Sequence, residues 1–239
     1  MTQHADPDYL EVSVAGLVMS GDTEEFERLR GELESGPPVV AANVFLPSGI
    51  RLVGPEAGTE RVLDYVGEAT ARLRQLGVRL LVFGSGGPRR IPDGYDRERA
   101  LGELAEFCRQ TAGILEPAGI TLVLEPLRRA ESNVWNSVGE VAGFIRERQL
   151  HGVRLLADLY HMQEDGEPIS AVTEHADLLA HTHVAGAGRI PPSPAPELVA
   201  FLAAVKEARG DLTCSIECRW NDFAGELRPA LATLRELAR

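Results

Sequence analysis

The sequence has little of several features that define other classes of protein. Among its 239 residues are three cysteines and 5% aromatic side chains, and no apolar run approaches the ~18 residues of a membrane span. The cysteines (Cys108, Cys214, Cys218) are odd in number and lack CxxC spacing, which suits a reducing interior better than a disulfide framework. The start, MTQHADPDYLEVSV, lacks the basic and apolar regions of a signal peptide. We therefore expect a soluble, cytoplasmic protein.

Basic side chains are also in the minority. Lys and Arg total 24 against 36 Asp and Glu, which gives a formal net charge of −12. That charge opposes tight binding to phosphate backbones and to anionic lipid surfaces, so neither nucleic acid nor membrane is an expected partner. The length and the 44% hydrophobic content suit one domain, residues 1–239, around one sizeable core.

Short runs rich in Val, Ile and Leu alternate with longer amphipathic stretches along the whole chain, which is typical of repeated βα units. The expected strands are 9–14, 39–46, 79–86, 120–127, 153–159, 178–185 and 212–218. The expected helices are 22–35, 59–77, 96–117, 137–149, 196–209 and 226–238. Right-handed crossovers would make the sheet parallel, and this number of units favours a closed TIM-type barrel over an open doubly wound sheet.

The Gly-rich segment FGSGG, residues 83–87, offers a competing hypothesis, a phosphate loop in a nucleotide-binding sheet. It matches neither GxGxxG nor GxxxxGK[ST], and PRRIPDGYD follows it instead of an immediate helix. We interpret these glycines as residues that let the backbone turn at a strand end near the active site.

Polar side chains stand at the C-terminal ends of four successive expected strands, where a barrel of this type carries its chemistry. They are Glu125, then Asp158 with His161, then His181 and His183, then Glu217. Of the two histidines in HTH, His183 lies nearer the mouth and is the better ligand, with His181 as its second-layer partner. Three carboxylates and one imidazole form a hard site that suits Mn²⁺ or Mg²⁺, with Co²⁺ and Zn²⁺ as alternatives.

Four segments resemble the xylose isomerase-like sugar isomerase and epimerase superfamily, above all its ketose 3-epimerase and hydroxypyruvate isomerase-like branch. They are LEPLRRAESN (124–133), DLYHM (158–162), HTHVAGAGR (181–189) and SIEC (215–218). The resemblance implies one divalent metal ion held by Glu125, Asp158, His183 and Glu217. It further implies that Glu125 and Glu217 are the acid/base pair, and that Glu131, His161 and Arg189 contact the substrate.

The implied activity is isomerisation or epimerisation of a sugar or a related α-hydroxy ketone. A metal that chelates the carbonyl and hydroxyl oxygens would stabilise an enediolate, and two carboxylates on opposite sides would remove and return the proton. His161, neutral or protonated, would donate a hydrogen bond to the developing oxyanion. Arg128, Arg129 and the PRR segment 88–90 add positive charge that favours an acidic substrate, unless neighbouring acids pair with them.

One expected feature of the superfamily is missing from the sequence. Its members usually have a strand and a helix before the segment that resembles DYLEVSV, and here only MTQHADP precedes it. The alternatives are a seven-stranded barrel, closure by another chain, or a shortened start. Since an uncovered edge exposes backbone groups and apolar surface, we expect a homo-oligomer that covers it.

Three other functions compete with an isomerase. A lyase or dehydratase would use the same metal-enolate chemistry, and a non-catalytic binding subunit would keep the constellation in a degenerate barrel. An apurinic-site endonuclease shares the barrel, but it needs more histidines than this mouth supplies and a DNA groove that the net charge of −12 disfavours.

Overall fold

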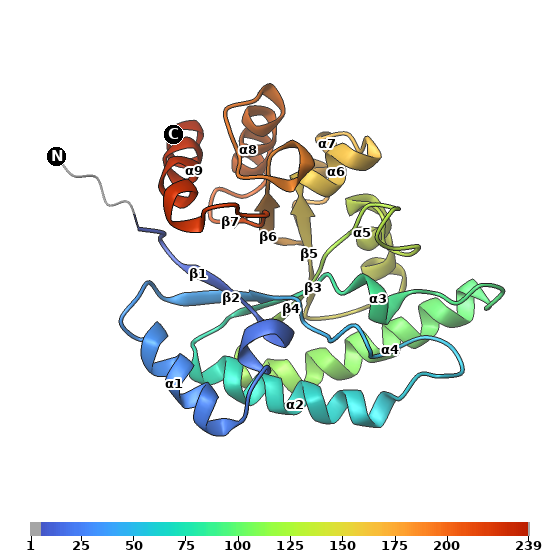
Figure 1. Ribbon diagram of the computed structural model, residues 1–239. Coiled ribbons are helices and arrows are strands. Elements are labelled where there is room, and N and C mark those ends of the chain that lie inside the picture. The colour runs from blue at the N-terminus through green and yellow to red at the C-terminus, as the bar shows by residue number, and fades with distance from the viewer. Residues whose placement is uncertain (1–5, 239) are drawn as a thin grey trace.

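Seven parallel strands form one sheet in chain order (Figure 1). The computed structural model describes residues 6–238, apart from the side chains of residues 59 and 60. The strands are β1 (Leu10–Ser13), β2 (Val39–Asn43), β3 (Leu80–Phe83), β4 (Thr121–Leu124), β5 (Val153–Asp158), β6 (Leu179–Val184) and β7 (Thr213–Ile216). Each lies within its predicted segment, so the seven strands and the TIM-type barrel are confirmed.

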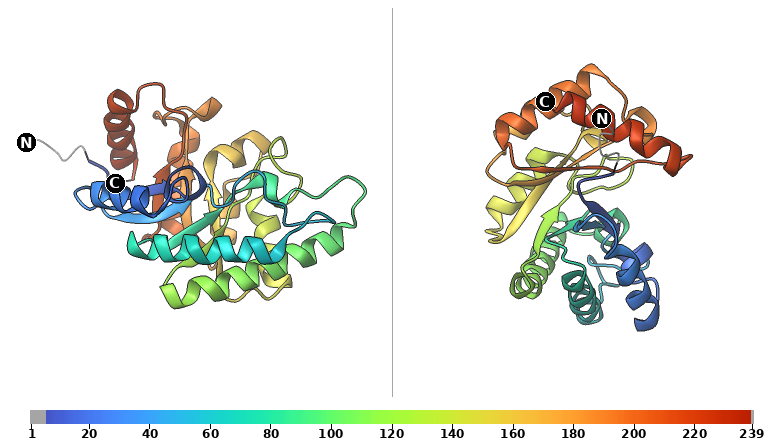
Figure 2. Two further views of the ribbon diagram at one scale, coloured as in Figure 1. Left: turned by 60° about the horizontal axis from the view of Figure 1, so that its bottom comes forward. Right: turned by 90° about the vertical axis from the view of Figure 1, so that its left-hand side faces the viewer.

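Helices cover the outside of this sheet (Figures 1 and 2). The six predicted ones are α1 (Thr23–Leu33), α2 (Thr59–Gln75), α4 (Arg97–Leu115), α5 (Val138–Glu147), α8 (Pro196–Ala208) and α9 (Phe223–Leu237). The predicted helix 96–117 ends in the 3₁₀ helix η2 (Glu116–Ala118), which directly follows α4. Not predicted are the π-helix η1 (Val14–Val18), the 3₁₀ helix η3 (Ala187–Arg189), and the short helices α3 (Gly86–Arg89), α6 (Leu159–Asp165) and α7 (Ser170–Glu174). Within residues 6–238, no helix has the length and apolar character to cross a membrane.

The first long helix shows how local sequence sets the element boundaries. The side chain of Asp22 accepts a hydrogen bond from the backbone N–H of Glu25 (3.0 Å), and the Glu25 carboxylate accepts one from the N–H of Asp22 (3.0 Å). This capping box starts α1 at the predicted place. After α2, Gly77 has a φ of +81°, so this glycine, the last residue of the predicted helix 59–77, lies just beyond the helix end in the left-handed conformation that ends helices.

Inside the barrel, a small apolar layer lies beneath the polar mouth. Val82, Val123 and Leu156 are fully buried and form a cluster separate from the large core between sheet and helices. Because side chains alternate along a strand, the next residues on the same face are Gly84, Glu125 and Asp158. The apolar layer therefore closes the floor of the barrel directly below the residues predicted to carry the chemistry.

Side chains bridge β1 and β7, the first and last strands. In the described chain the backbone ladders run from β1–β2 to β6–β7, and none joins β1 to β7. The Tyr9 hydroxyl lies 3.0 Å from Ser215 Oγ, and Glu11 on β1 contacts His181 and His183 on β6. The result is a nearly closed barrel. Residues 1–5, most of the MTQHADP segment, lie outside the described part, so closure by another chain and a shortened start stay predictions.

Candidate metal and active site

The four predicted metal ligands come together at the C-terminal mouth of the barrel. Glu125, Asp158, His183 and Glu217 each offer one ligand atom, and these atoms all lie within 4.8 Å of one another. His183 Nδ1 lies 3.4 Å from Glu125 Oε1 and 3.8 Å from both Asp158 Oδ2 and Glu217 Oε2. Three carboxylates thus face one imidazole nitrogen, from the ends of β4, β5 and β7 around β6.

Glu125 follows β4 and is 3% exposed. Burial raises the pKa of its carboxyl group, and the nearby Glu217 raises it further. A glycine makes room for this side chain, because a Cβ built on Gly84 would lie 1.7 Å from Glu125 Oε2. The first glycine of FGSGG therefore has a specific role. It leaves the space that the Glu125 carboxylate occupies.

Asp158 ends β5 and also caps the helix that follows. Its Oδ1 accepts a hydrogen bond from the backbone N–H of His161 (3.1 Å), which starts α6, while Oδ2 faces His183. The spacing DLYH thus places the aspartate on the ligand cluster and the histidine one turn into the helix. Burial raises the pKa of Asp158 to about 7, with the charge of Glu125 as the next cause.

His183 is held from behind by Glu11, a residue that sequence reasoning missed. His183 Nε2 lies 3.0 and 3.1 Å from the two Glu11 carboxylate oxygens, and His181 Nε2 lies 2.9 Å from Oε2. Burial alone would raise the pKa of Glu11, but the two imidazoles hold that pKa well below its usual range. Burial alone would lower the pKa of His183, but the Glu11 carboxylate holds that pKa well above its usual value. The signal for Glu11 in the sequence was a single acidic residue inside the apolar run YLEVSV.

His161 presents one free ring nitrogen beside the cluster. The backbone N–H of Arg128 donates to its Nδ1 (3.3 Å), which places the ring proton on Nε2. His161 Nε2 is buried and has no hydrogen-bond partner. Burial lowers the pKa of His161 to about 3, and the charge of Arg189 lowers it too. Of the two states considered from sequence, the neutral one is therefore present near neutral pH.

The other predicted substrate-contacting residues, Glu131 and Arg189, line the same mouth. Arg189 Nη1 lies 3.6 Å from Glu131 Oε2, and its Nη2 donates to Glu217 Oε2 in a close ion pair. The Arg189 guanidinium also lies over the Tyr160 ring, 5.5 Å from its centroid. A second missed residue, Asn43 at the end of β2, donates to Glu217 Oε1 (3.2 Å). Each oxygen of the Glu217 carboxylate thus accepts a hydrogen bond, Oε1 from Asn43 and Oε2 from Arg189.

Three of the extra cations noticed in the sequence, Arg89, Arg128 and Arg129, are paired or buried, whereas Arg90 is exposed. The ion pairs are Arg128 with Glu131 (2.7 Å) and Glu164 (2.7 Å), and Arg129 with Asp165 (3.0 Å). Arg89 is fully buried, where it donates to the carbonyl oxygens of Phe83 (3.1 Å) and Glu125 (2.8 Å). Of the two possibilities considered from the sequence, a site for an acidic substrate or pairing with neighbouring acids, Arg128 and Arg129 follow the second. Arg89 instead holds the backbone next to Glu125.

The cluster fits a divalent cation. Glu125 Oε1 and His183 Nδ1 are both buried, face each other and have no hydrogen-bond partner. Buried polar atoms of this kind are rare in folded proteins and call for a bound group. Carboxylate oxygens with one imidazole are donors that hard or borderline divalent ions accept. Sequence reasoning found this set because each ligand follows an apolar strand.

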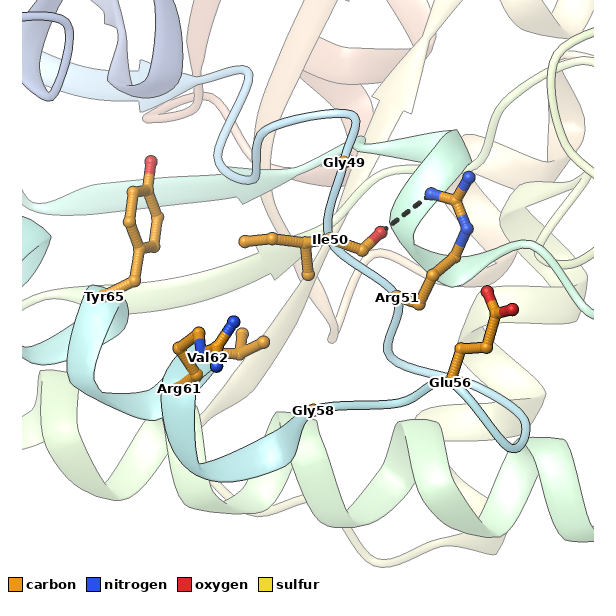
Figure 3. A pocket seen from close by; sticks show the side chains of 8 residues that line it. All are labelled: Gly49, Ile50, Arg51, Glu56, Gly58, Arg61, Val62 and Tyr65. Carbon is orange, nitrogen blue, oxygen red and sulfur yellow. Dashed lines mark hydrogen bonds between the residues drawn. The ribbon is translucent and has the colours of Figure 1, made fainter.

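A cavity of about 630 Å³ opens directly onto the cluster. Its polar wall holds Glu125, Glu131, Arg189 and Glu217, and the rest is lined by small and apolar residues of the loops after β1, β2 and β3. A larger cavity of about 760 Å³ lies elsewhere, between loop 49–58 and α2 (Figure 3). Arg51 there donates to the Ile50 carbonyl oxygen (2.9 Å), and no residue of the carboxylate cluster lines it. The smaller cavity is therefore the candidate active site.

Residues 8–237 match the model of a known family, the xylose isomerase-like TIM barrel. The chain belongs to this family. The match spans nearly the whole described chain, so every element around the mouth, including the helix after β7, lies within it. The family membership expected from four short motifs is thus confirmed over the full barrel.

Individual relatives of this xylose isomerase-like chain are epimerases. It is 27% identical over 154 residues to 3-dehydro-D-guloside 4-epimerase of Escherichia coli, covering 62% of this chain and 57% of that protein. It is 30% identical over 104 residues to D-psicose 3-epimerase of Ruminiclostridium cellulolyticum, covering 40% of this chain and 34% of that protein. The matches therefore span less than two thirds of either relative.

Solved structures show the same barrel. A D-psicose 3-epimerase from Clostridium cellulolyticum, crystallised with D-tagatose, superposes with a TM-score of 0.81 at 19% identity, covering 97% of this chain and 89% of that chain. At this level of identity the likeness establishes the fold. Function must be argued from the residues at the mouth.

Proposed function

We propose that this protein is a divalent-metal-dependent epimerase or isomerase of a sugar or related α-hydroxy ketone. The observation that carries the proposal is the convergence of Glu125 and Glu217 on His183 Nδ1 at the floor of a 630 Å³ cavity. Two curated relatives of the chain are named as sugar epimerases, which supports the same reaction class.

Glu125, Asp158, His183 and Glu217 would hold the cation, with Mn²⁺ or Mg²⁺ favoured by the oxygen-rich donor set. When bound, the cation would supply a Lewis acid that polarises a substrate carbonyl group. No thiolate belongs to this donor set, which distinguishes it from the sulfur-rich sites that select zinc.

The protein's own groups would move the proton. Glu125 and Glu217 approach the cavity from β4 and β7, on either side of β5 and β6. One, as a carboxylate, would take a proton from the carbon next to the carbonyl, and the other, as a carboxylic acid, would deliver its own proton to the opposite face. Burial makes the Glu125 carboxyl group a stronger proton acceptor than an exposed glutamate, since it raises the pKa of that group.

The neighbouring residues would position the substrate. His161, with its ring proton on an unpartnered buried Nε2, would donate a hydrogen bond to a substrate oxygen. Glu131 and Arg189 line the same cavity and would bind hydroxyl groups farther from the reacting carbon. Because all three side chains are already held by protein partners, they would lose little conformational entropy when the substrate binds.

Exchange with deuterated water tests the reaction. We expect the Mn²⁺-loaded protein, given D-psicose, D-tagatose and 3-keto glycosides in turn, to place deuterium at the carbon that bears the moved proton, as detected by NMR. Glu125→Gln and Glu217→Gln should each lower the exchange rate by roughly 10²-fold or more. Glu116→Gln, an exposed glutamate in η2, should not.

Other outcomes would overturn the proposal. Loss of a β-substituent from the substrate, in place of epimerisation, would assign a lyase. Absence of exchange across the panel, with cation bound, would assign a non-catalytic binding role. Undiminished exchange in Glu125→Gln would remove that carboxylate from the acid/base pair.

A further inference from the structure

The interior of the barrel holds one carboxylate that the proposed reaction does not use. Glu11 lies on β1 with its side chain 6% exposed. Its two oxygens accept hydrogen bonds from the Nε2 atoms of His181 and His183, at 2.9 to 3.1 Å. Among residues 6–238, no Lys or Arg side chain donates a hydrogen bond to Glu11. Glu11 therefore has two imidazoles as its partners, and one belongs to the candidate metal site.

This contact determines which nitrogen of His183 faces the other ligands. An imidazole ring that donates from Nε2 to a carboxylate leaves Nδ1 as the nitrogen that can bind a cation once that atom carries no proton. His183 Nδ1 is the atom that points to Glu125, Asp158 and Glu217, and it has no hydrogen-bond partner. The position of Glu11 thus fixes the ring orientation that a metal ligand requires.

His181 supports the arrangement from the side. Thr213 Oγ1 lies 2.6 Å from His181 Nδ1, so the hydroxyl can donate there while Nε2 donates to Glu11. Ser215 Oγ lies 3.2 Å from the same Nε2 and 3.0 Å from the Tyr9 hydroxyl. A chain of polar contacts therefore runs from β1 through β7 and β6 back to Glu11.

We propose that Glu11 is a positioning residue of the metal site, holding His183 so that Nδ1 faces the three carboxylates. This inference rests on the proposed function, because it needs a cation at that cluster. Glu11 is on β1 and His183 on β6, so the affinity of the site also depends on a side-chain contact that spans the seam between β1 and β7, where the described residues form no backbone ladder.

The same three residues, Glu11, His181 and His183, could instead hold a second cation, because their ligand atoms also lie within 4.8 Å of one another. The hydrogen-bond contacts favour the positioning role. Each Nε2 already has Glu11 at hydrogen-bond distance, and both ring nitrogens of His181 have hydroxyl partners. The number of ions bound per chain separates the two interpretations.

Titration with Mn²⁺ tests the inference on the full chain, with the dissociation constant and stoichiometry measured by calorimetry. We expect the wild-type protein to bind one ion and Glu11→Leu to bind one ion about 10- to 100-fold more weakly. Glu11→Gln keeps one acceptor oxygen and should fall between them. Tyr65→Phe is the matched control, because it removes a part-buried hydrogen bond, from the Tyr65 hydroxyl to the Phe45 carbonyl oxygen (2.9 Å), that involves neither Glu11 nor the two histidines. Its dissociation constant should equal that of the wild type.

A spectroscopic measurement distinguishes positioning from a general loss of structure. In the Mg²⁺-loaded wild type, ¹⁵N shifts of His183 should show an Nδ1 without a proton and a protonated Nε2. This pattern should be lost in Glu11→Leu and kept in Tyr65→Phe. If Glu11→Leu does not fold, the same comparison is made with Glu11→Gln.

The outcomes separate this inference from the proposed function. Wild-type affinity in both Glu11 variants, with one ion still bound, would overturn the positioning role and leave the proposed function intact. Two ions in the wild type, one of them lost in Glu11→Leu, would overturn it in favour of a second metal site. Absence of any bound ion in the wild type would overturn both.

Discussion

At the scale of single residues, the absence of a side chain is as important as its presence. Gly84 stands at the end of β3, and a Cβ there would meet Glu125 Oε2 at 1.7 Å and its Cδ at 2.8 Å. No rotation of a small side chain avoids this overlap, so the Glu125 carboxylate itself would have to move. Since that carboxylate is a predicted ligand, the glycine matters for the site more than for the fold.

We therefore expect Gly84→Ala to weaken Mn²⁺ binding by at least about tenfold, as displaced metal ligands do, while thermal unfolding changes little. Gly87→Ala is the control in the same loop, because a Cβ there meets its nearest atom at 3.9 Å. Calorimetric titration and circular dichroism measure the two effects. Equal affinity in both variants would show that the carboxylate does not need the space above Gly84.

We expect Asp158 to make metal binding depend on pH. Its pKa is raised to about 7 in the metal-free protein, chiefly by burial, so below that pH the carboxyl group carries a proton that a cation must displace. The apparent affinity for Mn²⁺ should then fall ~tenfold for each pH unit below 7 from this group alone, and Glu125, whose pKa is also raised, adds to the slope.

The same shift has an opposite consequence for the metal-free fold. A pKa raised above its unfolded value contributes stability that is lost as pH rises through the folded value, here about 7. Asp158→Asn should therefore weaken binding at every pH and flatten the metal-free stability profile around neutrality. Titrations and unfolding curves across this range measure both, and a flat wild-type binding profile below pH 7 would contradict the prediction.

Residues of the second layer are where sequence reasoning failed. The predicted ligands Glu125, Asp158, His183 and Glu217 could be proposed because each stands at the end of an apolar run. Glu11 could not, because one acid within YLEVSV has many structural explanations, and its role depends on a contact with a residue 172 positions away. Long-range contacts of this kind leave no periodic signal in the chain.

At the scale of elements, periodicity predicted the long helices and all seven strands but none of the short helices at the barrel mouth. α3, α6 and η3 follow β3, β5 and β6, and they have too few residues to show a helical repeat. α6 could have been recognised only from its cap, the Asp158 side chain that accepts from the N–H of His161.

Strand irregularities also place the site. The register of β1 against β2 shifts between Leu10 and Glu11, and that of β5 against β6 shifts between Leu155 and Leu156. Such bulges redirect the side chains that follow them and are common next to active sites. Here they precede Glu11 and Asp158, which both face His183. Alternation of apolar and polar residues assumes a regular strand, so this redirection could not be predicted from the sequence.

At the scale of the whole molecule, the seam between β1 and β7 is the least covered part of the barrel. All four residues of β7 are partly exposed, whereas the last three residues of β3 and the last three of β4 are fully buried. α9, which follows β7, helps to hold the seam, because Arg235 donates to the Asp6 carbonyl oxygen (2.7 Å) and to the Asp8 carboxylate (3.1 Å). Near the start of α9, Phe223 is 57% exposed and packs on Trp220.

An exposed apolar group beside an incompletely paired strand favours self-association, so we expect the protein to form a homo-oligomer that buries Phe223. Light scattering coupled to size exclusion should give a mass of at least twice 25.9 kDa, and Phe223→Ser should shift it toward the monomer. Val199→Ser on α8, at a residue 47% exposed, should leave the mass unchanged. Neither surface substitution should alter the free energy of unfolding of the monomer by more than about 0.5 kcal/mol, so a change in mass reports the interface and not the fold. A monomeric wild type would mean that the side-chain contacts of Tyr9, Glu11 and Arg235 are sufficient to close the barrel.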